Sequence, residues 1–481
     1  MGRGAGPHPR PQRRRQGAAG IGRIAPGDSA RRAGGCDQAA SRPGTRNAAA
    51  RRRMGAGADR PRAAGHPPAA AIAAGPGPIS RPVAAPGCHA AAGRETELRA
   101  MPQTIHRWPA QQRVRTGPVA ETLPPEIEDC GRVLLATTRS LVRSDIARTV
   151  RAALGSRLAA EHATMRAHSP LEDVLDLAAM IADSGAERVV TLGGGSVIDG
   201  AKVACRAAWE GVTDAEGLVG LAVSRGAEPE EWERVEPLPR IVAVPTTLSA
   251  AEFAPHAGYT DLAAGRKMRA VSPAQVPRAV LLDPAATLET PAELLLSSGI
   301  RAVDHAAERL CARDRAPFSD AVSRQALVML ARALPAIRRT AADLAARSEA
   351  QQAMWLSVMG GWSGVPVGAS HGIGYILGGA RGVPHGITSC LGLPAVMQWN
   401  EPVNRDRQAE IAHLFGGATG HAALRRFIRD LGLPTTLAEV GIGESEIEPL
   451  AARWDGGPPI ATNPRPVRSH ADVAEILRLM R

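Results

Sequence analysis

The chain has 481 residues, a formal net charge of +11 and a hydrophobic content of 44%, and a chain of this length is expected to form two domains or more. Residues 1–100 carry the positive charge, because they hold 18 arginines, no lysine and 5 acidic residues. The other 381 residues hold 40 basic and 42 acidic residues, which excludes a general polyanion binder for this larger part. We expect no membrane helix and no signal peptide, because no apolar run approaches the ~20 residues that span a bilayer.

Residues 1–100 consist mainly of Ala, Arg, Gly and Pro and contain no Phe, Trp or Tyr. Such a segment cannot bury enough apolar surface to offset the entropy of ordering it, so we expect a disordered extension, with Met54 and Met101 as alternative starts of translation. Two functional alternatives remain open: arginine triplets at residues 13–15 and 51–53 that bind phosphate backbones, or an arginine-rich transit peptide. The lack of aromatic residues and of amphipathic periodicity argues against both.

Cysteine and lysine are both used sparingly. The cysteines lie far apart without a CxxC pair, which indicates reduced thiols in the cytosol rather than a disulfide framework or a zinc ribbon. They are Cys36, Cys88, Cys130, Cys205, Cys311 and Cys390. The only lysines are Lys202 and Lys267. Among so many arginines, a retained lysine points to a position that favours a compact ammonium over a planar guanidinium.

An alternation of strands and helices begins near Arg132. Short apolar runs predict buried parallel strands, and apolar residues every three or four positions predict helices. In chain order these are a strand over Arg132–Thr137, helices over Ser144–Leu154 and Leu171–Ser184, a strand over Arg188–Leu192, a helix over Val197–Trp209, and strands over Arg240–Val244 and Arg278–Leu282. This order is typical of a doubly wound α/β domain.

The strand patterns end near Pro291, and the rest of the chain has helical periodicity. The predicted helices are Pro291–Cys311, Ser319–Leu344, Gln351–Trp362, Arg405–Phe415 and Ala422–Leu431. We therefore expect three parts: the extension of residues 1–100, an α/β dinucleotide-binding domain over residues 101–290, and an all-α substrate domain over residues 291–481.

A glycine-rich turn joins a predicted strand to a predicted helix at residues 193–196. Backbone N–H groups of such a turn can approach a pyrophosphate at the positive end of the helix. Thr246 and Thr247 end another strand, where they could face the same crevice or cap a helix. Thr138 and Arg139 follow the first strand, where an acidic residue would repel a 2′-phosphate, so NADPH is expected to be accepted as well as NADH. The candidate coenzyme contacts are Gly193, Gly194, Gly195, Ser196, Asp199, Lys202, Thr246, Thr247 and Thr138.

Five motifs, in this order, resemble those of the iron-containing (group III) alcohol dehydrogenase family. They are Gly193–Lys202 (GGGSVIDGAK), Pro245-Thr246-Thr247 followed by Glu252, Asp283-Pro284 ahead of Pro291, Ser298–Glu308 (SGIRAVDHAAE) and Gly368–Gly386 (GASHGIGYILGGARGVPHG). The match extends from Arg132 to Pro466 and is strongest to the maleylacetate reductase branch. The resemblance implies a fold like that of iron-containing alcohol dehydrogenases and dehydroquinate synthases, with the active site between the two domains. It also implies hydride transfer between a nicotinamide and a carbonyl or alcohol.

The metal-dependent members of this family hold a divalent ion with one Asp and three His. By motif, these positions correspond here to Arg301, His305, Tyr375 and His385. A tyrosine is a poor ligand at neutral pH, and a guanidinium would place a fixed positive charge beside the ion. Because a catalytic metal normally has three protein ligands, we expect no tightly bound iron or zinc. Asp304 is expected on a different helix face from His305, where it would not restore the site.

Carbonyl reduction without a metal requires other groups that stabilise the developing oxyanion and supply a proton. His371 and Tyr375 are four residues apart and share one face if their segment is helical, and Arg301 could grip a substrate carboxylate through two hydrogen bonds. Taken singly, His371 and His385 could instead be helix-end or turn residues, and His256 a solvated loop residue. The catalytic candidates are Arg301, His305, His371, Tyr375 and His385.

The resemblance implies reduction of maleylacetate, or of a related unsaturated oxo-dicarboxylic acid, to 3-oxoadipate with NADH or NADPH, as in aromatic-compound catabolism. The alternative within the family is a metal-assisted alcohol or aldehyde dehydrogenase with a small neutral substrate. A lyase related to dehydroquinate synthase would need the missing metal, and a nucleic-acid-binding protein acting through residues 1–100 is the rival from another class. We expect a cytoplasmic homodimer that binds a small oxo-acid and has no nucleic-acid or membrane partner.

Overall fold

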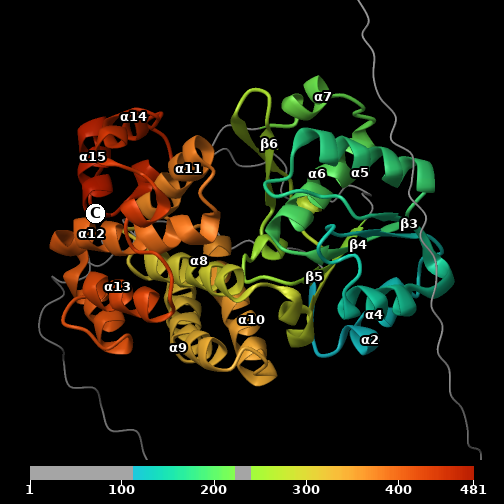
Figure 1. Ribbon diagram of the computed structural model, residues 1–481, viewed down its shortest axis with the longest axis horizontal. Coiled ribbons are helices and arrows are strands. Elements are labelled where there is room, and N and C mark those ends of the chain that lie inside the picture. The colour runs from blue at the N-terminus through green and yellow to red at the C-terminus, as the bar shows by residue number, and fades with distance from the viewer. Residues whose placement is uncertain (1–111, 223–239) are drawn as a thin grey trace, which may run out of the picture. The chain divides into compact units, whose positions relative to one another are not determined.

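The computed structural model describes residues 112–222 and 240–481, which belong to one compact unit (Figure 1). The expected disorder of residues 1–100 and the domain limit at residue 101 lie outside the described residues. Within the two described ranges, no helix is both long enough and apolar enough to cross a bilayer.

Six parallel strands form the central sheet in the order β1-β8-β5-β4-β2-β3. The four inner strands were predicted from the sequence, and each lies close to its predicted span. The outermost strands, β1 and β3, were missed because edge strands are partly exposed and lack a continuous apolar run. The strands are β1 (Arg113–Thr116), β2 (Val133–Ala136), β3 (Leu158–His162), β4 (Arg188–Gly193), β5 (Arg240–Pro245) and β8 (Ala279–Leu282).

Helices cover both faces of this sheet, as two neighbouring residues of β2 show. Leu134 packs in one apolar cluster with α5 (Leu171–Ser184) and α6 (Gly195–Glu210), whereas Leu135 packs in another with α4 (Asp145–Leu154). Successive strand residues point to opposite faces of a sheet. The arrangement confirms the predicted doubly wound α/β architecture.

An antiparallel hairpin of β6 (His256–Asp261) and β7 (Arg266–Val271) was not predicted. Its buried residues, among them Tyr259 and Met268, pack in the same cluster as α6. Because side chains alternate along a strand, Lys267 points away from that cluster. The hairpin thus presents one of the two lysines on its other face.

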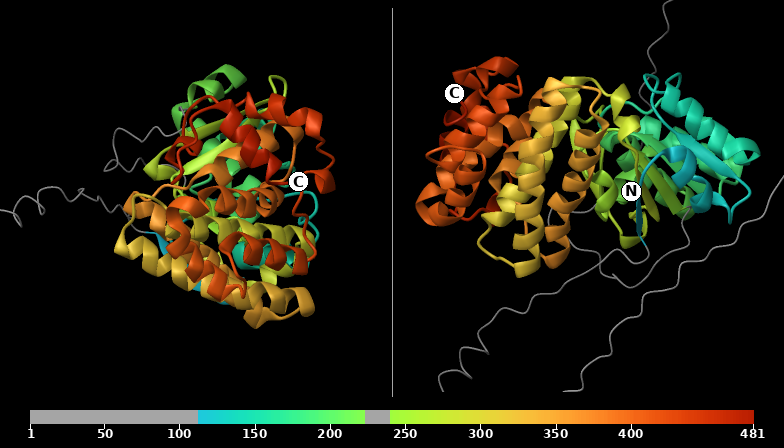
Figure 2. Two further views of the ribbon diagram at one scale, coloured as in Figure 1. Left: turned by 90° about the vertical axis from the view of Figure 1, so that its left-hand side faces the viewer. Right: turned by 90° about the horizontal axis from the view of Figure 1, so that it is seen from below.

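Within residues 292–481 the structure describes helices and no strand, as predicted, and Figure 2 shows these helices in yellow to red. Val280 and Leu282 of β8 belong to the same apolar core as Ile300, so the core continues from the sheet into the helices. The predicted helix Arg405–Phe415 is the second part of a longer helix that is kinked at Asn404. The helices are α8 (Ala292–Leu310), α9 (Pro317–Arg339), α10 (Leu344–Met359), α11 (Ala369–Arg381), α12 (His385–Leu414), α13 (Gly420–Asp430), α14 (Ile447–Ala451) and α15 (His470–Arg478).

The first turn of α12 lies directly against the backbone of α8. A Cβ atom on Gly386 would lie 2.6 Å from the carbonyl carbon of Ser297, far inside van der Waals contact. Only a glycine allows this approach, which brings the N-terminus of α12 next to the middle of α8. The approach therefore fixes where the polar residues of the two helices meet.

Gly386→Ala is expected to lower the free energy of unfolding by ~1–3 kcal/mol, because the added methyl must push α12 away from α8. Gly379→Ala on α11 is the matched control, since a Cβ atom there would meet no atom within 4 Å. The control should be neutral or stabilising by ~0.5–1 kcal/mol, as alanine favours a helix over glycine. Urea denaturation measures both, and wild-type stability of Gly386→Ala would contradict the close approach.

Candidate active site

The glycine turn lies at the carboxyl ends of the two central strands. Gly193 ends β4 beside Pro245 of β5, and its carbonyl accepts a 3.0 Å hydrogen bond from the N–H of Thr246. A Cβ atom on Gly194 would lie 2.9 Å from the methyl carbon of Thr247, so the turn needs glycine here. The turn, which continues into Gly195, therefore places bare backbone at the N-terminus of α6, where N–H groups and the helix dipole favour a pyrophosphate.

The topology puts a ligand crevice at the same edge of the sheet. The chain runs from β2 to β3 on one side of β2 and then to β4 on the other, and ligands of open α/β sheets bind at such a switch point. Thr138 follows β2 there, with its hydroxyl 2.9 Å from that of Ser140. Thr247 Oγ1 is buried and has no hydrogen-bond partner among the described residues. A bare glycine turn and an orphaned hydroxyl both fit a dinucleotide.

Ser196 supports a strained loop beside the turn. Its Oγ accepts a 2.9 Å hydrogen bond from the N–H of His168, and its carbonyl accepts one of 2.8 Å from Ser169 Oγ. His168 and Ser169 have φ angles of 66° and 50°, a region that non-glycine residues rarely adopt. Strained backbone persists only where surrounding contacts hold it and is concentrated at functional sites. The strain marks His168 as a site residue that sequence reasoning missed.

Lys202 has a structural role in place of the predicted contact with the coenzyme. Its side chain is fully buried, and its Nζ donates to three backbone carbonyls at 2.5, 2.9 and 3.1 Å, those of Ala251, Ala254 and His256. An ammonium has three N–H donors, so these carbonyls use all of them. Asp199, 3.8 Å from the same nitrogen, accepts from the N–H of Gly258 at 3.0 Å. Both side chains therefore hold β6 and the segment before it against α6.

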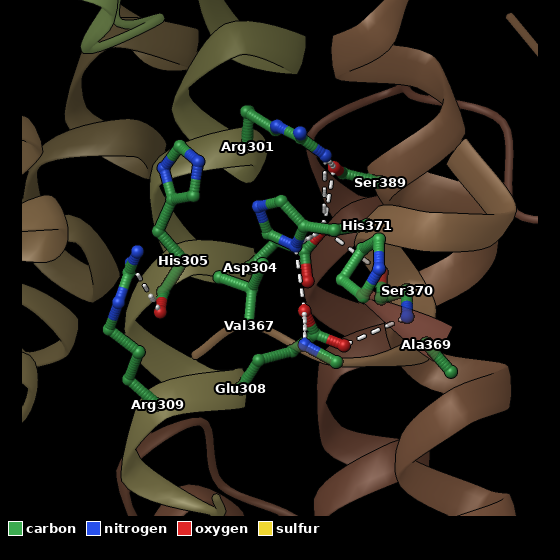
Figure 3. A network of polar contacts seen from close by, with 12 residues as sticks. Arg301, Asp304, His305, Glu308, Arg309, Val367, Ala369, Ser370, His371 and Ser389 are labelled. Carbon is green, nitrogen blue, oxygen red and sulfur yellow. Dashed lines mark hydrogen bonds and ion pairs between the residues drawn. The ribbon is translucent and has the colours of Figure 1, made fainter. Parts of the chain in front are cut away.

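Glu308 of α8 joins two helices through one buried carboxylate (Figure 3). Its oxygens accept 2.8 Å hydrogen bonds from the N–H groups of Gly368 and Ser370 at the start of α11, and its Oε2 lies 2.6 Å from Nδ1 of His371. Because the carboxylate acts as an acceptor, we assign the imidazole proton to Nδ1, which leaves Nε2 as an acceptor. In the described part of the chain, His371 Nε2 has no hydrogen-bond partner. Glu308 thus orients His371 and fixes its tautomer.

Asp304 belongs to the same cluster, a placement that the sequence analysis did not address, since it expected Asp304 only to lie on a different face of α8 from His305 and not to restore a metal site. Its Oδ2 accepts hydrogen bonds of 2.9 Å from Ser370 Oγ and 2.7 Å from Ser389 Oγ, and lies 3.6 Å from Nδ1 of His371. The expectation compared Asp304 only with its neighbour on α8. It could not account for α11 and α12, which pack on the face that Asp304 occupies (Figure 3).

Arg301 supplies the positive charge of this cluster. Its Nη1 donates to Ser389 Oγ at 3.1 Å and lies 3.7 Å from Asp304 Oδ2. The pKa of Asp304 is raised to about 8, because burial and the nearby Glu308 carboxylate both raise it and outweigh the lowering effect of Arg301. Burial likewise raises the pKa of Glu308, against the N–H groups that favour its charged form. The two carboxyl groups therefore resist being ionised together.

Two imidazoles face each other across this cluster. The rings of His305 and His371 lie 4.7 Å apart between centroids. Burial lowers the pKa of both well below the ordinary value, and the guanidinium of Arg301 lowers both further. Both rings are therefore neutral at physiological pH, in which state each can accept or donate a proton.

His385, at the start of α12, is the centre of an adjoining group. Its ring lies edge-on to that of Tyr375 at 5.9 Å and to that of His168 at 6.2 Å. Its Nε2 contacts the Nζ of Lys267 on β7. Burial lowers the pKa of His385 well below its usual value, and the Lys267 ammonium lowers it further. The ring is therefore neutral, with Nε2 accepting from the ammonium and the hydrogen on Nδ1.

The structure brings the predicted catalytic residues together along α8, α11 and the start of α12. Ring contacts join His305 on α8 to His371 on α11, and Tyr375 on α11 to His385, while Arg301 lies on α8 with His305. Their catalytic roles stay predictions. Sequence reasoning missed five neighbours of these residues, although lysine scarcity was a signal for one of them. They are Asp304, Glu308, Ser389, His168 and Lys267.

A divalent metal ion fits this donor set poorly. Atoms of Asp304, Glu308 and His371 all lie within 4.8 Å of one another, a spacing that could hold an ion. The oxygens concerned already accept N–H and O–H hydrogen bonds, and His371 Nδ1 faces the Glu308 carboxylate. Two side chains with a positive charge lie nearby: Arg301 beside this cluster and Lys267 against His385. Their charges repel a metal cation bound at the same place.

Comparisons with known proteins agree with this architecture. Residues 111–284 match the model of iron-containing alcohol dehydrogenase, and residues 295–480 match the model of the C-terminal region of the Fe-containing alcohol dehydrogenase family. The chain is 32% identical to a dehydrogenase of Alternaria alternata, covering 66% of this chain and 91% of that protein. It is 31% identical to a maleylacetate reductase of Rhizobium sp. strain MTP-10005, covering 68% and 83%. The crystal structure of maleylacetate reductase from Agrobacterium tumefaciens superposes with a TM-score of 0.65 at 26% identity, covering 79% and 98%.

The raised pKa of Asp304 makes stability depend on pH. In the folded protein this carboxyl holds its proton up to about pH 8, whereas in the unfolded chain it loses the proton near pH ~4. The folded state therefore binds more protons between these values, and stability falls as the pH rises through this window. Relative to Asp304→Asn, the wild type should lose up to ~1.4 kcal/mol of unfolding free energy per pH unit.

Urea denaturation of both proteins at several pH values between ~5 and ~8 measures this difference. The exposed Asp314 offers the control, because Asp314→Asn should leave the pH dependence of the wild type unchanged. A stability difference between wild type and Asp304→Asn that stays constant over this range would contradict a protonated Asp304.

Proposed function

The chain belongs to the iron-containing alcohol dehydrogenase family, and from this premise we propose that it reduces maleylacetate, or a related unsaturated oxo-dicarboxylic acid, to 3-oxoadipate. The observation that carries the proposal is the buried guanidinium of Arg301, held by Ser389 and Asp304 next to two neutral histidines. A guanidinium has five N–H donors in a planar fork and matches a carboxylate. The likeness to a maleylacetate reductase supports the same substrate class.

The proposed reaction is a conjugate reduction. A hydride moves from NADH or NADPH to the alkene carbon that is β to the ketone, and the π electrons of the alkene shift so that the ketone oxygen becomes an enolate oxygen. The loss of the hydride leaves NAD+ or NADP+. A proton then adds to the other alkene carbon, the one bonded to the ketone carbon, and this step regenerates the ketone. The site must therefore bind two carboxylates, stabilise an oxyanion and supply one proton.

We assign most of these functions to described residues and propose that no metal is needed. Arg301 would bind a carboxylate of the substrate, while neutral His371, oriented by Glu308, and neutral His385 would accept or donate the proton. The glycine turn and Thr247 would hold the coenzyme, whose dihydronicotinamide supplies the hydride. Metal-independent catalysis is part of the proposal, because two fixed cations occupy the surroundings of the histidines.

We also propose a cytoplasmic homodimer. The cytoplasmic setting is supported by the cysteines of the described chain, which are all buried as free thiols: Cys130, Cys205, Cys311 and Cys390. Free buried thiols are typical of a reducing compartment. The dimer remains an expectation from the family and is tested by sedimentation equilibrium.

The alternative within the family is a metal-assisted alcohol or aldehyde dehydrogenase with a small neutral substrate. The name of the family supports it directly. A comparison of substrates separates the two: oxidation of NADH and NADPH is followed with maleylacetate, and separately with a short neutral aldehyde. Turnover of maleylacetate with little turnover of the aldehyde would support our proposal, whereas the reverse preference would favour the alternative.

Arg301→Ala should lower kcat/KM for maleylacetate by ~1.5–3 kcal/mol, the usual loss for a hydrogen bond to a charged group. Arg324→Ala is the control, because Arg324 pairs with Glu410 on the surface of α9 and should be neutral for turnover. Steady-state kinetics with a saturating coenzyme measure the effect. An unchanged kcat/KM would remove Arg301 from the mechanism.

A further inference from the structure

Lys267 is one of two lysines in the chain, and the mechanism above assigns it no step. It lies on β7 of the hairpin, which belongs to the α/β half, yet its ammonium contacts Nε2 of His385 at the start of α12. The contact therefore spans from the half that holds the glycine turn to the half that holds Arg301. The other lysine, Lys202, is fully used by backbone carbonyls.

A glycine of the hairpin leaves room for the side chain of Lys267 beside α6. A Cβ atom on Gly258 would lie 3.4 Å from Lys267 Cε and 3.6 Å from Asp199 Oδ2. Gly258 thus leaves space between β6 and the first turns of α6 through which the lysine extends. Asp199 lies beside the same position, and its pKa is raised by burial, whereas the positive charges of Lys202 and Lys267 lower it.

A hydrogen bond and a ring contact connect the partner of the Lys267 ammonium, His385, to the glycine turn. The N–H of His168 donates to Ser196 Oγ in the turn, and the His168 ring lies 6.2 Å from that of His385, the partner of Lys267. Burial lowers the pKa of His168 and of His385, and the positive charge of Lys267 lowers both further. His168 and His385 therefore connect the ammonium to the glycine turn.

We propose that Lys267 is a catalytic residue of this site, whose ammonium donates a hydrogen bond to the oxygen on which negative charge develops during hydride transfer. The inference rests on the proposed function and deepens it. Arg301 then binds a carboxylate from the α8 side, and Lys267 stabilises the oxyanion from the hairpin side. An oxo-acid with a carboxylate and a reducible double bond conjugated to its ketone is the substrate class that uses both cations.

The chemistry of an ammonium suits this role. It carries three N–H donors on one nitrogen, so it can hold His385 Nε2 and a substrate oxygen at the same time. When the hydride adds to the alkene carbon, the electron pair that arrives on the ketone oxygen lies next to a fixed positive charge. The interaction is stronger in the transition state than with the neutral ketone, so it should act on kcat.

Three variants at this position separate charge from structure. Lys267→Met removes the ammonium, Lys267→Gln keeps a donor for His385 without charge, and Lys267→Arg keeps the charge. We expect kcat for maleylacetate to fall by ~10²–10³-fold in the first two, the range for loss of one oxyanion donor, and less in the third. KM for the coenzyme should stay near the wild-type value. Arg266→Met, on the exposed neighbouring residue, is the matched control and should behave as wild type.

Methylammonium added to Lys267→Met should restore part of kcat, because a small amine can enter the space left by the lysine and supply the missing charge. A purely structural role of Lys267 would not give such rescue. Thermal unfolding and NADH fluorescence quenching establish that each variant is folded and binds coenzyme. If Lys267→Met does not fold, Lys267→Gln decides the question.

Two results would overturn the inference: wild-type kcat in a folded Lys267→Gln or Lys267→Met variant, or an effect confined to the KM of the coenzyme. The second would make Lys267 a coenzyme contact. Failure of the proposed function is distinguishable, because it would show as absent maleylacetate turnover in the wild type. In that case the same variants are compared with the carbonyl substrate that the wild type does reduce, and an unchanged kcat there would equally overturn the role of Lys267.

Discussion

The rest of the site depends on the hydrogen bonds that the carboxylate of Glu308 accepts. It accepts hydrogen bonds from the first N–H groups of α11 and from His371, so it joins α8 to α11 and sets the orientation of one imidazole at the same time. A carboxylate at a helix N-terminus is favoured by the helix dipole, which offsets part of the cost of burying it. Asp304, Ser370 and Ser389 then extend the network to Arg301 and α12.

This network explains why the site is made of neutral imidazoles between fixed cations. Burial keeps the histidines uncharged, while Arg301 and Lys267 carry positive charge on either side of them. We propose that the two cations bind an anionic substrate. Under this proposal, a fold shared with iron-containing alcohol dehydrogenases supports carbonyl or enone reduction by side-chain cations, because stabilising a developing oxyanion requires positive charge rather than a particular ion.

The sequence predicted the inner strands, most long helices and the glycine turn, because these depend on local patterns and ordered motifs. The five catalytic candidates lie in one region, and their catalytic roles stay predictions. The sequence analysis missed the hairpin, whose charged, half-exposed strands have no apolar run, and with it the contact of Lys267 with His385. It also could not foresee the partners of Asp304 and Lys202. The surroundings of both are set by segments far away in the sequence: α11 and α12 around Asp304, and residues 251–256 around Lys202.

The central claim, reduction of an oxo-acid by side-chain cations, is tested most directly by one assay on the full chain. The protein is treated extensively with a chelator, its iron and zinc content is measured, and oxidation of NADH and NADPH is followed with maleylacetate as substrate. The account predicts that turnover survives when the metal content is far below one ion per chain. Loss of turnover on chelation, with recovery on addition of Fe²⁺ or Zn²⁺, would contradict it.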